Sequence, residues 1–230
     1  MNSWFLLNSG KCEAAYNMAL DEALLETVAS LGRPALRFYG WTEPAATFGY
    51  FQRYADVERG IRLRPLVRRP TAGGIVPHDR DWTYSLVFPP GHDWYALRAE
   101  ASYRRVHEWI QAAFRLLRVP TELAPHSTVH DPRSAKGCFV GHEKFDLLWH
   151  GRKIAGAAQR RNRLGLLIQG SVQSPEISLS RPDWENAMRE SVPVSGGVEW
   201  LELAPDSDLR GRTGTLVREK YSQQEFITRR

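Results

Sequence analysis

The predicted helices and strands follow one another along the chain without regular alternation, and this order most constrains how the chain can fold. Two long stretches, 13–32 and 101–118, have the apolar spacing of amphipathic helices. Short runs rich in β-branched and aromatic residues, typical of strands, fall at 35–41, 45–52, 64–69, 83–89, 145–149, 152–161 and 165–172. Such a mixture, without repeated βαβ units, predicts an α+β fold in which helices flank one mainly antiparallel or mixed sheet.

Local signals refine this outline. Gly32 follows the last apolar position of the first helix and is expected to end it. That helix carries Leu20, Leu24, Val28 and Leu31 on one stripe and its acidic residues elsewhere, as in an amphipathic helix. The runs 35–41 and 45–52 are separated by Thr-Glu-Pro, the pattern of a strand pair. His150–Gly151 predicts a tight turn between two further strands.

The chain of 230 residues is long enough for one sizeable hydrophobic core, and we expect a single domain over 1–230. The region 173–230 is less regular than the rest and is expected to pack on it. Within this region, helices are expected near 183–190 and 222–229.

Composition excludes several classes of protein. No apolar run approaches the roughly 20 residues that span a bilayer. The short apolar patch at the N-terminus lacks the basic residues that precede it in a secretory signal. Cys12 and Cys138 form neither a disulfide framework nor a CxxC motif. We therefore expect a cytoplasmic protein that does not bind membranes.

Arginine is concentrated in two segments, 59–70 and 151–163, within a chain of formal net charge +5. Two basic segments beside glycine-containing turns favour an anionic ligand, such as a phosphate or a nucleotide, or an acidic partner protein. A pair of solvated strand edges is the simpler alternative. Because no RRM, KH or zinc-finger signature accompanies the charge, nucleic acid is not an expected partner.

The segment RRPTAGGIVPH, residues 68–78, places two arginines before a loop with few side chains. Gly73 and Gly74 let backbone N–H groups approach an oxyanion closely. Because side chains alternate along a strand, only one of Arg68 and Arg69 is expected to face a ligand, while the other braces the scaffold or faces a partner. The loop lacks the GK[ST] of a Walker A motif, and a plain hairpin turn with surface arginines is the alternative.

Lys153 lies on a predicted strand and is followed by Gly156 and two alanines. These small residues leave space beside the lysine for a ligand, and an ammonium group suits a phosphate or a polarised carbonyl. An exposed strand lysine without a ligand is the alternative.

Cys138 lies in a glycine-flanked segment with Lys136, His142 and Lys144 nearby in sequence. Basic neighbours lower the pKa of a thiol and favour a thiolate nucleophile. A buried cysteine that only fills space is the alternative. The histidines show no HxH or HExxH spacing, so we predict no metal site.

Five segments together resemble the biotin/lipoate A/B protein ligase superfamily, in its lipoate–protein ligase and octanoyltransferase branch. They span about residues 4–172 and occur in the family's order: NMALDEALLE at 17–26, LRFYGWTEPAATFGYFQ at 36–52, RRPTAGGIVPHD at 68–79, DLLWHGRKIAGAAQRR at 146–161 and LLIQGSV at 166–172. The resemblance implies a fold like those of class II aminoacyl-tRNA synthetases and biotin–lipoyl ligases. It also implies one catalytic domain over 1–230, with 173–230 as a divergent tail.

The resemblance assigns a role to the glycine loop, which reads RR-x-[ST]-GGG-x-V-x-H in the family. The implied acyl- or acyl-adenylate-binding residues are Arg69, Thr71, Ala72, Gly73, Gly74 and His78. Ala72 replaces the first glycine of the triplet. Gln169 stands where a common HG[ST] motif of the family has histidine.

The resemblance also assigns roles to the later strands. Lys153 matches the lysine of the family's K-[IV]-x-G motif, which contacts the acyl carbonyl and phosphate and helps catalysis. Asp146 matches the acidic residue of an N-D-L strand, with Phe145 in place of the usual asparagine. Gly156 and Ala158 complete the implied acyl-binding residues.

Two branches of the superfamily differ in chemistry. A ligase activates free lipoate with ATP and Mg²⁺ to an acyl-adenylate, whereas a transferase moves octanoate from acyl carrier protein to an enzyme cysteine and requires no cofactor. Cys138, eight residues before Asp146, resembles the nucleophile of the cysteine-dependent octanoyltransferases. Phe145 and the absence of the accessory C-terminal domain of many single-chain ligases favour the same branch.

In the implied reaction, the Cys138 thiolate attacks the octanoyl thioester, and Lys153 stabilises the thiolate and the tetrahedral oxyanion. The acyl chain lies beside Ala155–Ala158. The implied partners are acyl carrier protein as donor and, as acceptors, lipoyl domains of 2-oxoacid dehydrogenases or the glycine cleavage H protein, with the enzyme as a monomer.

Three other functions are alternatives to octanoyl transfer. They are an ATP-dependent lipoate–protein ligase, a biotin–protein ligase, which is disfavoured because its GRGRxGR loop is absent, and a non-catalytic module that binds an acyl group or a nucleotide.

Overall fold

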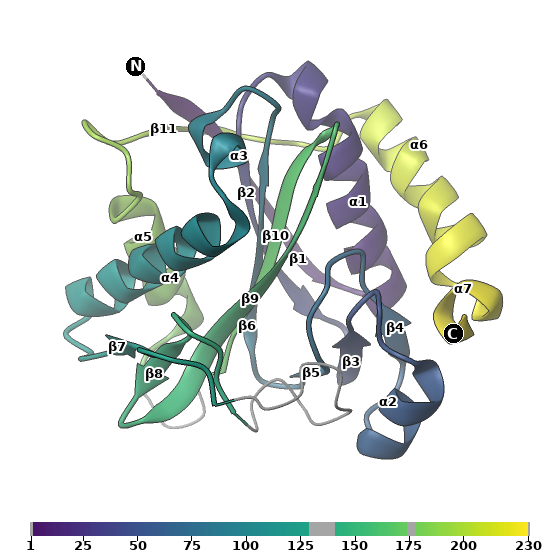
Figure 1. Cartoon of the computed structure of the whole chain (residues 1–230). Coiled ribbons are helices and arrows are strands. Elements are labelled where there is room, and N and C mark those ends of the chain that lie inside the picture. The colour runs from purple at the N-terminus through teal and green to yellow at the C-terminus, as the bar shows by residue number, and fades with distance from the viewer. Residues whose placement is uncertain (1, 129–140, 174–177, 230) are drawn as a thin grey trace.

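The computed structural model describes residues 2–128, 141–173 and 178–229, and Figure 1 shows its sheets with helices on both sides. The larger sheet has the strand order β11-β1-β2-β6-β10-β9-β8-β7. Its strands are β1 (Ser3–Cys12), β2 (Ala35–Trp41), β6 (Trp82–Phe88), β7 (Glu122–Leu123), β8 (Leu147–Trp149), β9 (Arg152–Asn162), β10 (Gly165–Val172) and β11 (Glu199–Glu202). β1 is parallel to β11 and β2, and the other neighbours are antiparallel. The prediction of an α+β fold with a mixed sheet is confirmed.

A smaller sheet has the order β4-β3-β5. Its strands are β3 (Ala45–Phe48), β4 (Leu66–Arg68) and β5 (Val76–His78). The predicted pairing of the runs 35–41 and 45–52 is wrong, because β2 and β3 belong to different sheets. Both edges of β2 are occupied by β1 and β6. All four residues of β3 are buried, so β3 requires pairing strands of its own.

Helices cover both faces of the larger sheet. They are α1 (Ala14–Leu31), α2 (Tyr54–Gly60), α3 (Asp93–Ala96), α4 (Ala99–Leu116), α5 (Arg181–Glu190), α6 (Ser207–Leu216), the π-helix η1 (Val217–Tyr221) and α7 (Gln224–Thr228). In Figure 1, α4 and α5 lie on one side of the sheet, and α1 lies on the other side with α6 outside it. No helix in the described ranges is long and apolar enough to cross a membrane.

The helix α1 ends as predicted but is less amphipathic than predicted. Gly32 adopts a left-handed conformation with φ 67°, and its N–H bonds to the carbonyl of Val28. However, Asp21 and Glu22 are buried, not exposed to solvent. Asp21 faces the sheet, where Arg37 and Tyr39 bond to it. Glu22 is covered by η1, where Lys220 and Tyr221 bond to it.

The two faces of the larger sheet differ in chemistry because side chains alternate along each strand. On β2, Leu36 and Phe38 face the core formed with α4 and α5, where Trp184 packs edge-on against Phe38. Arg37 and Tyr39 face α1, where both bond to a buried carboxylate. The face toward α4 and α5 is therefore apolar. The face toward α1 combines an apolar cluster with buried polar groups and is called the polar face below.

The region after residue 177 packs on both sides of this framework. β11 extends the larger sheet beside β1, α5 packs against α4, and α6 packs against α1. The fully buried Arg68 of β4 bonds to backbone carbonyls of two segments, one of which lies near the end of the chain. It donates to Tyr50, Gln52, Phe226, Ile227 and Arg229. Arg68 therefore braces the scaffold, as one of the two adjacent arginines was expected to do.

Candidate functional site

A cavity of about 500 Å³, including space open to solvent, is lined by residues of both sheets and of α1. Its lining residues are Met18, Tyr39, Thr47, Arg69, Gly73, Val76, His78, Thr83, Lys153, Gly156, Ala157, Ala158, Gln169, Gly170 and Ser171. The polar face of the larger sheet and the smaller sheet thus meet at this cavity. Arg69, Gly73, His78, Lys153, Gly156 and Ala158 are lining residues that the sequence predicted as site residues.

The glycine loop is folded tightly around Arg69. The guanidinium donates to the Ala72 carbonyl over 2.6 Å from Nη2 and to the Thr71 hydroxyl over 3.2 Å from Nε. Gly73 has φ +93°, and a Cβ there would lie 2.7 Å from Arg69 Nη2. Gly74 follows as a half-buried residue. The structure therefore places the predicted loop residues around one arginine at the cavity wall.

Lys153 is held against a buried carboxylate. Its Nζ lies 2.7 Å from Asp146 Oδ2, with the two side chains 8% and 0% exposed. A Cβ on Gly156 would lie 2.7 Å from Lys153 Cε and 2.9 Å from its Nζ. Only glycine at this position leaves room for the lysine to lie along β9. The spacing of Lys153 and Gly156 thus has a steric reason.

Two residues of α4 lie next to Asp146, and the sequence analysis did not propose them for the site. The Tyr103 hydroxyl donates to Asp146 Oδ1, and His107 Nε2 lies 4.0 Å from the same oxygen. Burial and the charge of Asp146 raise the pKa of Tyr103 well above its usual range. Burial lowers the pKa of His107 to about 4, so its ring is neutral near pH 7. The one signal in the sequence was a tyrosine on the apolar face of the predicted helix.

His78 belongs to a second buried network. Its Nδ1 lies 2.8 Å from Asp81 Oδ2, and its Nε2 lies 2.8 Å from the Thr47 hydroxyl. Asp81 also accepts bonds from Thr83 and Ser171. The carboxylate selects the tautomer with the proton on Nδ1, so Nε2 accepts from Thr47. Asp81 was not predicted; it directly precedes β6, and its partners lie on β5, β6 and β10.

Gln169 connects the glycine loop to α1. Its Oε1 accepts from the Thr71 hydroxyl over 2.8 Å, and its Nε2 donates to Asp21 Oδ2 over 2.7 Å. Asp21 also pairs with the buried Arg37 at 2.7 Å. Gln169, which departs from the family motif, therefore connects α1 to the glycine loop through two hydrogen bonds.

The Cys138 prediction concerns a residue outside the described ranges. Within those ranges, no group of three or more histidine, cysteine, aspartate or glutamate side chains could hold a metal ion.

Residues 13–174 match the family model "Lipoyl protein ligase A/B catalytic domain". The chain is similar to the octanoyltransferase LipM of Geobacillus kaustophilus, with 39% identity over 184 residues, which is 74% of this chain and 64% of that protein. The chain therefore spans less than two thirds of the length of this curated relative.

Solved structures support the fold. A Thermoplasma acidophilum protein assigned as a lipoate protein ligase, solved with bound lipoic acid, superposes with a TM-score of 0.79 at 20% identity and covers 99% of both chains. A lipoate-protein ligase A bound with ATP has a TM-score of 0.77 at 20% identity, covering 98% of both chains.

Proposed function

The chain belongs to the lipoyl protein ligase A/B catalytic domain family, and we propose that it transfers an octanoyl group to a lysine of a lipoyl domain. The observation that carries this proposal is the Lys153 ammonium, held by Asp146 at the wall of the cavity beside Gly156 and the two small residues after it. This arrangement offers a fixed positive charge next to space for an acyl chain. The resemblance to a named octanoyltransferase supports the choice of acyl group and reaction.

The proposed reaction has two transfers. In the first, the Cys138 thiolate attacks the carbonyl carbon of octanoyl-acyl carrier protein, and the bond to the carrier's sulfur breaks. The carrier leaves as a thiolate that takes up a proton. In the second, a neutral lysine amine of the lipoyl domain attacks the Cys138 thioester, an amide forms, and the amine loses a proton as the Cys138 thiolate is released. No external oxidant, reductant or nucleotide is needed.

Three residues at the cavity have roles in this scheme. Lys153 stabilises the oxyanion that forms at the thioester carbonyl in both transfers, because a positive charge already held in place stabilises developing negative charge. Gly73 and Arg69 shape the wall of the cavity from the glycine loop. We propose that residues 1–230 act as one catalytic domain, since β11, α5 and α6 pack on the elements that carry the cavity.

The test is incubation with octanoyl-acyl carrier protein and an apo lipoyl domain in the absence of ATP, followed by intact-mass measurement. We expect the lipoyl domain to gain one octanoyl group and the enzyme to carry a hydroxylamine-sensitive adduct that Cys138→Ala abolishes. Lys153→Ala should lower the rate about 1,000-fold, as for other oxyanion-stabilising groups. Lys11→Ala is the matched control, because Lys11 is exposed on β1 and does not line the cavity.

ATP-dependent lipoate ligation is the second candidate, because a neighbour with the same fold was solved with bound ATP. Under this alternative, the lipoyl domain would be modified only when free lipoate, ATP and Mg²⁺ are supplied. Cys138→Ala would then leave the activity unchanged, and this result would exclude the transferase.

A further inference from the structure

Asp146 is completely buried, and its carboxylate is held from three directions. Oδ2 lies 2.7 Å from Lys153 Nζ and accepts the backbone N–H of Glu143 over 2.7 Å. Oδ1 accepts a hydrogen bond from the Tyr103 hydroxyl. The orientation of this carboxylate therefore fixes where the ammonium of Lys153 lies.

Of these three donors, Tyr103 comes from the side of the larger sheet opposite α1. It lies on α4, which packs on the apolar face of the larger sheet with its side chains Val106 and Ile110 in the core. An 18-residue helix fixed in this way is a rigid support. The hydroxyl thus links the packing of the apolar face to a group at the cavity.

His107 lies near the same carboxylate but cannot replace Tyr103. Its Nδ1 donates to the Tyr103 carbonyl over 2.8 Å, which leaves a lone pair on Nε2. Nε2 lies 4.0 Å from Asp146 Oδ1, beyond hydrogen-bond distance, and is buried without a partner among the described residues. A neutral ring in this tautomer offers the carboxylate no proton.

We propose that Tyr103 is a positioning residue that acts on Lys153 through Asp146. This inference rests on the proposed role of Lys153 in acyl transfer. Tyr103 itself need not touch the acyl group, the donor or the acceptor.

The consequence of losing the hydroxyl follows from the geometry. Asp146 Oδ1 would lose a charge-assisted hydrogen bond. The carboxylate could then rotate, so that either of its two oxygens pairs with the Lys153 ammonium. The ammonium would then be distributed over more than one position. Misplacement of a catalytic group by about 1 Å lowers rates by up to about 100-fold.

The experiment compares Tyr103→Phe with Tyr95→Phe. Both changes remove one hydrogen-bonded hydroxyl, but the Tyr95 hydroxyl donates to the carbonyl of Asn162, over 3.0 Å, and has no contact with Asp146 in the described structure. For Tyr103→Phe we expect kcat for octanoyl transfer to fall about 10-fold with KM for the carrier unchanged. Tyr95→Phe should leave both constants within about twofold of the parent.

A second measurement does not depend on catalysis. The folded proteins are treated with limiting acetic anhydride, and the acetylation rate of Lys153 is read by peptide mass spectrometry. In the parent, Lys153 should react slowly, because its side chain is 8% exposed and paired. We expect the rate to rise several-fold in Tyr103→Phe, to stay at the parent value in Tyr95→Phe, and Lys144 to react equally in all three proteins.

The outcomes separate the two proposals. If the parent enzyme transfers no octanoyl group, the proposed function fails, while the acetylation comparison still tests the position of Lys153. If Tyr103→Phe loses activity but Lys153 reacts at the parent rate, the proposed route through Lys153 is wrong. An unchanged kcat in Tyr103→Phe would also overturn it.

Discussion

The two faces of the larger sheet are made by the same strands and both pack on apolar clusters, but the face toward α1 also holds a network of buried polar side chains. The apolar face packs against α4 and α5 through Leu36, Phe38, Tyr84, Leu86, Leu166 and Ile168. The polar face holds Arg37, Tyr39, Thr83, Ser85, Gln169 and Ser171, whose bonds lead to Asp21 and Asp81. The cavity opens on the polar face.

This difference shows how one sheet can serve stability and chemistry separately. Apolar packing stabilises the fold through burial and tolerates few polar groups. Buried charges stabilise little on balance, but they fix side chains in place when every partner is present. We therefore expect substitutions on the apolar face to reduce stability, and those at the cavity to reduce activity with less effect on stability.

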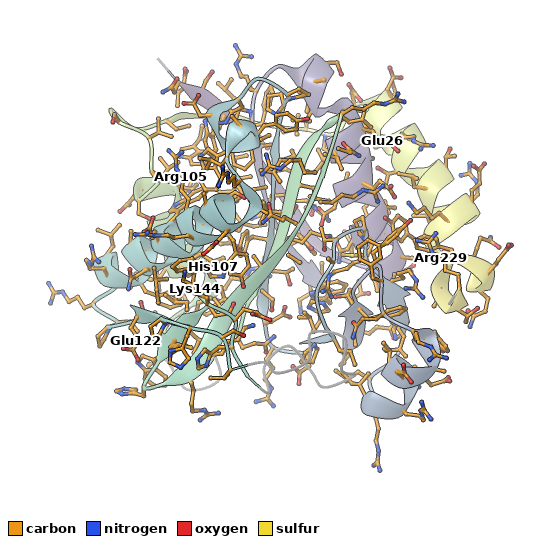
Figure 2. All side chains as sticks on the ribbon, in the orientation of Figure 1. Glu26, Arg105, His107, Glu122, Lys144 and Arg229 are labelled. Carbon is orange, nitrogen blue, oxygen red and sulfur yellow. The ribbon has the colours of Figure 1, made fainter. Side chains whose placement is uncertain are left out.

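The largest loss of stability should come from a substitution on the polar face, against the expected division between the two faces. Asp21 lies on the polar side but pairs with the buried Arg37, so Asp21→Ala leaves a buried guanidinium without its carboxylate. We expect the free energy of unfolding to fall by about 3–5 kcal/mol. Glu26→Ala on the same helix is the control, because Glu26 meets Arg212 near the surface between α1 and α6 (Figure 2). Urea unfolding should show a loss below about 1 kcal/mol for this control.

If Asp21→Ala cost no more than Glu26→Ala, the buried network would not contribute to stability. The polar groups would then contribute to activity alone, and the two faces would differ in function more completely than we propose.

Two glycines on paired strands provide the most direct test of the comparison. A Cβ at Gly156 would lie 2.7 Å from Lys153 Cε, whereas a Cβ at Gly170 would lie 2.2 Å from the Tyr84 ring in the core. We expect Gly156→Ala to lower kcat/KM about 100-fold by displacing the ammonium, with little change in melting temperature. Gly170→Ala should cost about 3 kcal/mol of stability, as overpacked cores do.

The opposite pattern, with Gly156→Ala unstable and Gly170→Ala inactive but stable, would contradict the assignment of the two faces. Circular dichroism melts and octanoyl-transfer rates measured on the same preparations distinguish the outcomes.

A pH dependence should follow from the neutral His107 on α4. Burial lowers its pKa from 6.5 to about 4, so the unfolded chain binds a proton below pH 6.5 that the folded protein does not. Stability should therefore fall with decreasing pH, by about 2 kcal/mol between pH 6.5 and about pH 5. Denaturant titrations at about pH 7.5 and about pH 5 should show this loss for the parent and a loss about 2 kcal/mol smaller for His107→Gln. Equal losses in both proteins would mean that His107 titrates normally.

The smallest effects should come from neighbouring residues on opposite faces of β10. Ile168→Val removes one buried methylene and should cost about 1 kcal/mol without changing activity. Gln169→Leu should cost a similar amount, because Thr71 and Asp21 each lose a partner. Only the second variant should also raise KM for the octanoyl donor, since the loop is no longer tied to α1. Unfolding curves and steady-state kinetics measure the two effects.

The sequence predicted features with local causes. The end of α1 at Gly32 and the turn at His150–Gly151 depend on backbone conformations that short segments determine. The lysine, glycine and small residues of β9 could also be identified, because they lie within six residues and follow a family pattern. These predictions require no knowledge of tertiary packing.

Features that depend on distant segments were not predicted. The burial of Asp21 depends on strands β2, β6 and β10, and the burial of Glu22 depends on Lys220 and Tyr221 of η1. Tyr103 reaches Asp146 across 43 residues of sequence, and only the packing of α4 brings them together. The separation of β2 from β3 likewise depends on strands formed later in the chain.

The hydrogen bonds of Arg68 have a consequence for the order in which parts of the chain fold during synthesis. Three of its carbonyl partners belong to Phe226, Ile227 and Arg229, about 160 residues further along the sequence. During synthesis at roughly 5–20 residues per second, β4 and the glycine loop leave the ribosome long before these partners exist. The guanidinium lacks these three partners until α7 has been made, so the burial of Arg68 against α7 is one of the last events in the folding of the protein. Figure 2 labels Arg229 near the end of the chain.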